Sequence, residues 1–245
     1  MRPVFFSKKV SSKRSSKSTT DVIRRAACAS FEQLEDRTLF ALAIAPYDPS
    51  TPISTLTNAL FKGSTGITVT NASFVGGNGQ AGTYTGFNVT DGTHSLSLGN
   101  GIILTSGLAV NALGPNNSSG VSKSWGTAGD TDLNSLIGTN NDANAYTVNF
   151  TATPATKSVS FSFVFGSDEF PEFVGEFNDA FAAYLDGKQI SFDSKNNPIT
   201  VNNNFFTLNN TNPSDTTTTA TQGKTVVNFN LQYDGLTPVL STILY

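Results

Sequence analysis

Residues 163–181 read FVFGSDEFPEFVGEFNDAF and carry a dense group of acidic side chains. Five carboxylates fall within twelve positions, no lysine or arginine lies in the stretch, and Pro171 interrupts any regular helix or strand ladder. Like charges crowded in a loop repel one another unless a cation or hydrogen-bond donors compensate them. Ca²⁺ takes about six to eight oxygen ligands, which carboxylates, amides and backbone carbonyls supply. The stretch is therefore a candidate Ca²⁺ site.

The candidate metal ligands form a primary and a secondary set. They are Asp168, Glu169, Glu172 and Asp179 in the primary set, and Asp130 and Asp132 in the secondary set. The second set contributes only if the fold brings the two segments together. The spacing is not that of an EF-hand. Two alternatives stay open: the acids are solvated or accept hydrogen bonds from turn amides, or they contact a partner or a glycan directly.

Catalysis has less support than ion binding. Glu169 with Glu172 or Glu176 could flank a glycosidic bond, but such a reaction needs two carboxyl groups facing each other across a cleft. The only histidine, His94, lies in a chain with no G-x-S-x-G sequence, and the only cysteine, Cys28, lies near the N-terminus. We expect no enzymatic activity; a glycoside hydrolase is the least favoured alternative.

The phenylalanines between the acids lie either in the core or on the surface, and the two positions imply different functions. We expect most of Phe170, Phe173, Phe177 and Phe181 to lie in the core, because aromatic side chains at strand spacing usually pack inside a sheet protein. An exposed ring among them would instead indicate a platform for a carbohydrate or a protein. A carbohydrate-binding module is therefore the alternative function.

Charge is divided unevenly along the chain. Residues 1–40 carry nine of the 15 basic side chains and four of the 18 acidic ones, so the rest of the chain keeps six basic and 14 acidic groups. An acidic body repels nucleic-acid phosphates. No apolar run approaches the roughly 18 residues that a membrane helix needs. We therefore expect neither a nucleic-acid partner nor a membrane span.

The elements that must position these residues are mostly strands. Period-two patterns occur in GITVTNASFVG, TYTGFNVT, SLSLGNGIILTSG, AYTVNFTAT and KSVSFSFVFG, separated by Gly, Asn and Asp. In the last segment Val159, Phe161 and Phe163 alternate with serines, as in an antiparallel strand with one buried face. Many short strands at this spacing predict an all-β protein, an antiparallel β-sandwich or jelly roll.

One or two short helices interrupt the strands. Residues 51–63 have Thr51 as an N-cap, Pro52 at the first helical position and Gly63 past the end. The segment 130–138 has Asp130 as its cap and Gly138 as its end.

Two domains follow from composition. Residues 1–45 form a basic tail, which we expect to be disordered. Within it, FEQLEDRTLF resembles the LEPR-XLL segment of exported planctomycete proteins, although Asp36 stands where that pattern has proline. The resemblance implies an export or sorting role. Residues 46–245 form the β-sandwich domain.

The body resembles the choice-of-anchor L domain of bacterial surface proteins. The resemblance is carried by GIILTSG, GDTDLNSLIG, the segment 158–187 and LQYDGLT. It implies an extracellular or cell-surface module with a structural or adhesive role, and partners in the cell envelope or extracellular matrix, glycans among them. Relatives usually continue beyond the YDG segment with further strands. We therefore expect a domain truncated at its C-terminus, with an unpaired sheet edge.

Overall fold

The structure is a computed structural model, and it describes residues 41–203, 206–210 and 221–244. Most of the basic tail, including FEQLEDRTLF, lies outside the described residues. The expected disorder and the export motif therefore stay predictions.

The described residues form an all-β protein with two short α-helices, α2 and α3, as the sequence predicts. The helical elements are α2 (Ser54–Leu60), α3 (Thr131–Ile137), η1 (Ala109–Ala112) and η2 (Val201–Asn203). The strands are β1 (Ala43–Pro46), β2 (Ile67–Val75), β3 (Ala81–Thr90), β4 (Ser95–Leu104), β5 (Ala145–Ala152), β6 (Val159–Phe163), β7 (Gly166–Ser167), β8 (Ala180–Phe181), β9 (Tyr184–Leu185), β10 (Lys188–Gln189), β11 (Ile199–Thr200), β12 (Leu208–Asn210), β13 (Thr225–Val227), β14 (Gly235–Leu236) and β15 (Leu240–Leu244).

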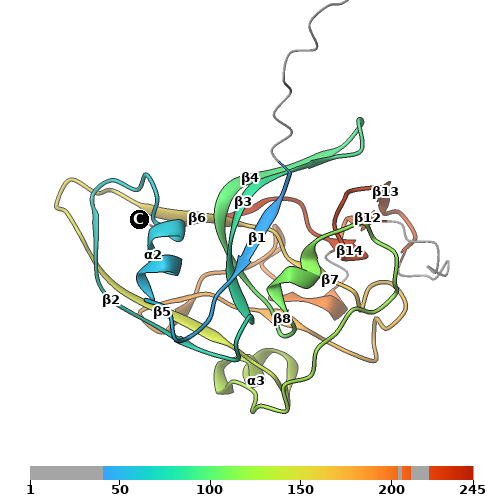
Figure 1. Cartoon of the computed structure of the whole chain (residues 1–245), viewed down its shortest axis with the longest axis horizontal. Helices are drawn as coiled ribbons and strands as arrows, with labels where there is room; N and C mark the ends of the chain where they lie inside the picture. Colours follow the sequence, from blue (N-terminus) through green and yellow to red (C-terminus); the bar gives the residue numbers. More distant parts are fainter. Residues whose placement is uncertain (1–40, 204–205, 211–220, 245) are drawn as a thin grey trace, which may run out of the picture. The chain divides into compact units, whose positions relative to one another are not determined.

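Strand pairing among the described residues makes several small sheets (Figure 1). A three-stranded sheet has the order β1-β3-β4 and a four-stranded sheet the order β13-β12-β14-β7; β2 pairs with β5, β6 with β15, β8 with β11 and β9 with β10. The pairs are antiparallel apart from β12 and β13, which are parallel. The four-stranded sheet joins strands from distant parts of the sequence, and it carries the candidate site.

The alternation predicted for β6 is present. Phe163 is buried, whereas Ser160 and Ser162 are exposed. The strand pairs with β15 in register from Val159 to Phe163, and the hydroxyl of Ser162 lies 2.7 Å from that of Ser241. The apolar face packs against Ile199 and Phe181, so β6 holds one side of the acidic segment in the core.

The two helices meet the predictions unequally. In α3, the Asp130 carboxylate accepts hydrogen bonds from the backbone N–H groups of Asp132 and Leu133, and Gly138 ends the helix with a φ of 79°. The predicted cap of the first helix, Thr51, is wrong. The helix α2 begins at Ser54, because the N–H and the hydroxyl of Thr51 both donate to the Asp48 carbonyl and close a turn there.

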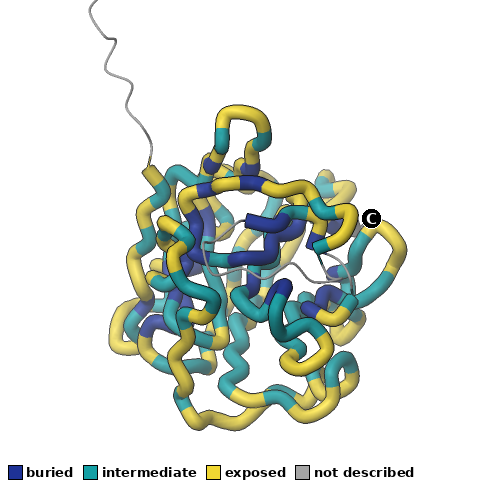
Figure 2. Tube along the Cα trace, turned by 90° about the vertical axis from the view of Figure 1, so that its right-hand side faces the viewer, coloured by how far each residue is buried: buried dark blue, intermediate teal, exposed yellow. Residues whose placement is uncertain are grey.

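The core consists of several apolar clusters rather than one. Figure 2 shows where the buried residues lie along the chain. One cluster joins Val89 and Leu96 of the β3–β4 hairpin to Phe229, Leu231 and Leu236. Another places Phe170 of the acidic segment against Val201 and Phe206. Among the described residues, no helix has the length and apolar character of a membrane span.

Candidate functional site

Pairing of β7 with β14 brings two sequence motifs together. Ser167 lies opposite Gly235, so Asp168 of the GSDE motif follows one strand and Asp234 of the YDG motif precedes the other. The pairing requires glycine at 235: a Cβ there would lie 2.6 Å from the Cβ of Phe170, closer than real contacts allow. The sheet therefore fixes where the acidic segment begins.

Asp168 is the most constrained carboxylate of the segment. Its Oδ2 accepts a hydrogen bond of 3.1 Å from the backbone N–H of Val121, whereas its Oδ1 is buried without a hydrogen-bond partner. Burial raises the pKa of Asp168 from 3.8 to about 6. The backbone N–H groups of Val121 and Asp234 oppose this rise, and the charges of Asp179 and Glu172 add to it.

The neighbouring carboxylates act on one another in the same direction. Burial raises the pKa of Glu169, and the charges of Asp179 and Asp168 raise it further. Burial also raises the pKa of Asp179, while a hydrogen bond with the Ser167 side chain lowers it. The four primary candidates are thus one electrostatic group, in which each added negative charge is unfavourable.

The secondary candidates lie at the start of α3, a helix that contacts β8. Asp130 caps α3, and Asp132 is exposed in the first turn of that helix. The hydroxyl of Tyr184 donates to the Asp132 carbonyl at 3.4 Å. Burial raises the pKa of Tyr184, and the charges of Asp132 and Asp130 raise it further. The structure thus gives Asp130 a structural role.

A ready-made metal site is not formed by these side chains. Among the described residues, no group of three or more His, Cys, Asp and Glu side chains has the arrangement to hold a metal ion. The fit to Ca²⁺ is therefore partial: the unpartnered Oδ1 of Asp168 suits a cation, but further ligands would have to come from waters, backbone carbonyls or a rotated carboxylate.

The phenylalanines divide between core and surface. Phe170 is buried, and the Phe181 ring lies 4.9 Å from that of Phe163, as expected for core residues. Phe177 differs, since 56% of it is exposed. Its ring meets Phe173 edge to face, with centroids 5.6 Å apart. One aromatic side chain of the segment is therefore available for contact.

Sequence reasoning missed the groups that surround the acids. Tyr233 lies close enough to Asp168 and Asp179 for their charges to affect it, although burial is the larger cause of its pKa of about 12. Val121 supplies its backbone N–H from a segment without regular secondary structure. The YDG motif was a visible signal for Tyr233; a backbone donor such as Val121 leaves no signal in the sequence.

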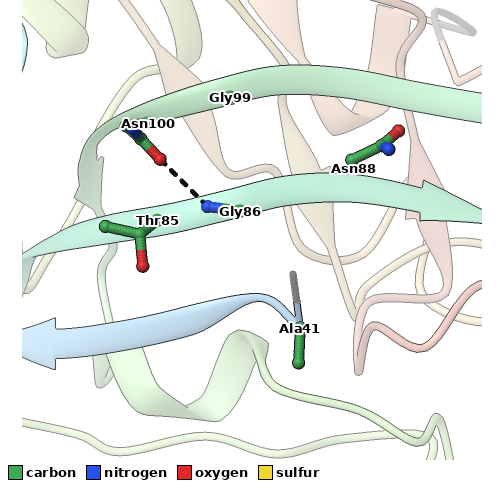
Figure 3. A pocket seen from close by; sticks show the side chains of 6 residues that line it. All are labelled: Ala41, Thr85, Gly86, Asn88, Gly99 and Asn100. Carbon is green, nitrogen blue, oxygen red and sulfur yellow. Dashed lines mark hydrogen bonds between the residues drawn. The ribbon is translucent and has the colours of Figure 1, made fainter. Parts of the chain in front are cut away.

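A separate hollow lies on the three-stranded sheet (Figure 3). It has a volume of about 470 Å³ and is lined by Ala41, Thr85, Gly86, Asn88, Gly99 and Asn100. The Asn100 side chain accepts a hydrogen bond from the Gly86 N–H at 3.0 Å, which bridges β4 and β3. The lining is uncharged and includes no residue of the acidic segment.

Comparison with known families decides the classification. The family model of the choice-of-anchor L domain matches residues 46–243. The chain belongs to the choice-of-anchor L domain family. Membership indicates a module of cell-surface or secreted proteins. No curated protein and no solved structure matches the choice-of-anchor L chain.

Proposed function

We propose that this choice-of-anchor L domain is a structural or adhesive module at the cell surface or outside the cell, and that a cation completes its acidic segment. The supporting observation is the coupled group of Asp168, Glu169, Glu172 and Asp179, in which burial and like charge raise the pKa of Asp168 to about 6. A bound cation would remove the repulsion that keeps these groups from ionising together.

Ca²⁺ is the proposed ion because the available donors are oxygens. Extracellular Ca²⁺ modules bind with Kd values of about 10⁻⁴–10⁻³ M, which suits a site that still needs waters or carbonyls. Millimolar Ca²⁺ would then stabilise the fold by about 1 kcal/mol. For a domain of this size, that free energy raises Tm by roughly 2–4 °C.

Thermal unfolding in Ca²⁺ and in chelator tests the proposal. The double variant Asp168→Asn, Glu169→Gln should lose the Ca²⁺-dependent rise in Tm. A matched variant, Glu176→Gln with Asp186→Asn, removes two exposed charges outside the ligand set and should keep it. An unchanged Tm for the natural sequence in Ca²⁺ would eliminate the cation from the proposed function.

Carbohydrate binding is the second candidate, and the exposure of Phe177 favours it. Aromatic rings with one open face stack on sugars, while neighbouring carboxylates and amides bond hydroxyl groups. A glycan array with the natural chain and with Phe177→Ala separates the candidates. Glycan binding that disappears in Phe177→Ala and is independent of Ca²⁺ would favour this function. We propose a non-enzymatic role in either case.

A further inference from the structure

The strands β2 and β5 form a two-stranded ribbon with open edges (Figure 1). Among the described residues, β2 pairs only with β5, and β5 only with β2. A two-stranded ribbon is marginally stable by itself, and neither strand contains a fully buried residue. Val75, at the end of β2, is 70% exposed, more than any other large hydrophobic side chain in the described part of the chain. The ribbon therefore has both backbone groups and apolar surface left to cover.

The outer edge of β2 presents the backbone groups of its half-buried residues. The Thr153 N–H donates to the Gly66 carbonyl at 2.8 Å, so this pair bonds across the ribbon. Alternate residues of an antiparallel ladder bond to the partner strand, and β5 continues that alternation without an extra residue. The residues of β2 that lie between the bonded ones direct their N–H and C=O groups away from β5. They are Ile67, Val69, Ala72 and Phe74.

A β-bulge at Thr70 makes this edge symmetric. The register with β5 skips Thr70, whose hydroxyl donates to the Asn149 carbonyl at 3.1 Å. The extra residue shifts the alternation by one position, so exposed and half-buried residues follow the same order in both directions between Ile67 and Phe74. The centre of the pattern lies between Thr70 and Asn71. Such an edge fits its own copy in antiparallel orientation, about a two-fold axis at that centre.

The composition of β2 also favours a second copy as the partner. Charged side chains and proline commonly protect sheet edges, and residues 63–90 contain neither. No like charges would therefore meet if two copies of this acidic chain paired through β2, and a partner recognised by charge would find no complement there. A bulge can also protect an edge. Here the bulge lies at the centre, where it meets its own copy and leaves the two halves of the strand free to pair.

We infer that the outer edge of β2 is a contact surface for a second copy of this chain. The two β2 strands pair antiparallel, with Ile67 opposite Phe74 and Thr68 opposite Ser73 of the second copy. The result is a four-stranded sheet in the order β5-β2-β2-β5, with its half-buried apolar residues on one face and its hydroxyl and amide side chains on the other. This surface is independent of the acidic segment and of any cation.

Two double variants at exposed positions test both the pairing and its register. Thr68→Lys with Ser73→Lys places like charges opposite each other on both sides of the axis, whereas Thr68→Lys with Ser73→Glu places opposite charges there. Sedimentation of the full chain at micromolar to millimolar concentration should show a dimer for the natural sequence. The Kd of the dimer should be at least about tenfold weaker for the Lys–Lys variant than for the Lys–Glu variant. Net charge alone predicts the reverse order, because two lysines reduce the net charge of −3.

A natural chain that stays monomeric at millimolar concentration would overturn the inference, and so would equal Kd values of the two variants. Amide hydrogen exchange of the natural chain gives a second measurement without substitutions. The amides of Val69 and Ala72 should become protected as the concentration rises, whereas those of Thr68 and Ser73, which face β5, should be protected throughout. Exchange at Val69 and Ala72 that does not depend on concentration would also contradict the inference.

Discussion

At the scale of single residues, the burial of Asp168 has a consequence for stability. Its carboxylate is buried beside Asp179 and Glu172, and the pKa of about 6 means that the folded chain holds a proton more tightly than the unfolded chain does. Stability from this group is therefore fully present below the ordinary pKa of 3.8, and it is lost as the pH rises through about 6.

This pKa predicts a pH-dependent stability that one substitution should remove. In chelator, the natural chain should lose about 1–3 kcal/mol of unfolding free energy between pH 4 and pH 7.5 from this group. Asp168→Asn keeps the shape and an oxygen for the Val121 N–H, and it should flatten this part of the profile. Urea unfolding at several pH values measures the difference. Parallel profiles for the two chains would contradict the prediction.

Asp130 had two predicted roles, and a substitution separates them. As the N-cap of α3 it should contribute about 1 kcal/mol, so Asp130→Ala should lower Tm by a few degrees. If capping is its only role, the Ca²⁺-dependent rise in Tm should remain. Asp132→Ala, which keeps the cap, should lower Tm less. A lost Ca²⁺ effect in Asp130→Ala would restore this residue to the ligand set.

At the scale of elements, local patterns predicted more than long-range pairing did. The alternation of Phe and Ser identified β6, and the Asp130–Gly138 signals identified α3 within a residue of its ends. The pairing of β7 with β12 and β13 through β14 could not be predicted, because it joins segments far apart in the chain and each strand is only two or three residues long.

Gly235 of β14 lies so close to Phe170 that adding a single methyl group at position 235 should destabilise the fold. Gly235→Ala would push Phe170 out of its packed position between Val201 and Phe206, which should cost about 1–3 kcal/mol. Gly120→Ala is the control, because a Cβ there meets nothing within 4 Å. Chemical denaturation of both variants measures the costs. Similar stability of the two would show that the sheet can absorb the added atom.

The candidate site was predictable in part. Composition alone identified the acidic segment, since five carboxylates without a cation are visible in the sequence. The sequence predicted Asp130 as the cap of α3, but it could not show which segments lie beside that helix, because that depends on the path of the chain between residues 138 and 166. Nor could it identify Val121, whose contribution is a backbone N–H.

At the scale of the whole molecule, the N-terminal boundary of the domain has a measurable consequence. The sequence placed it between residues 45 and 46, whereas β1 begins at Ala43 and pairs with β3 from Thr85 to Gly82. A chain that starts at Ala41 should therefore melt at the temperature of the full chain, and one that starts at Tyr47 should melt several degrees lower. Equal melting of the two shortened chains would show that β1 adds no stability.

The hydrogen bonds of the buried Asn210 side chain restrict which residue types can occupy this position. Its side chain donates to the carbonyls of Leu231 and Tyr233 and accepts from the N–H of Phe229, all within 3.0 Å and out of contact with water. Aspartate lacks the two donors, leucine lacks every polar atom, and glutamine is longer by a methylene. In a deep mutational scan, we expect nearly every replacement at 210 to be depleted, so that tolerance there would be among the lowest in the chain.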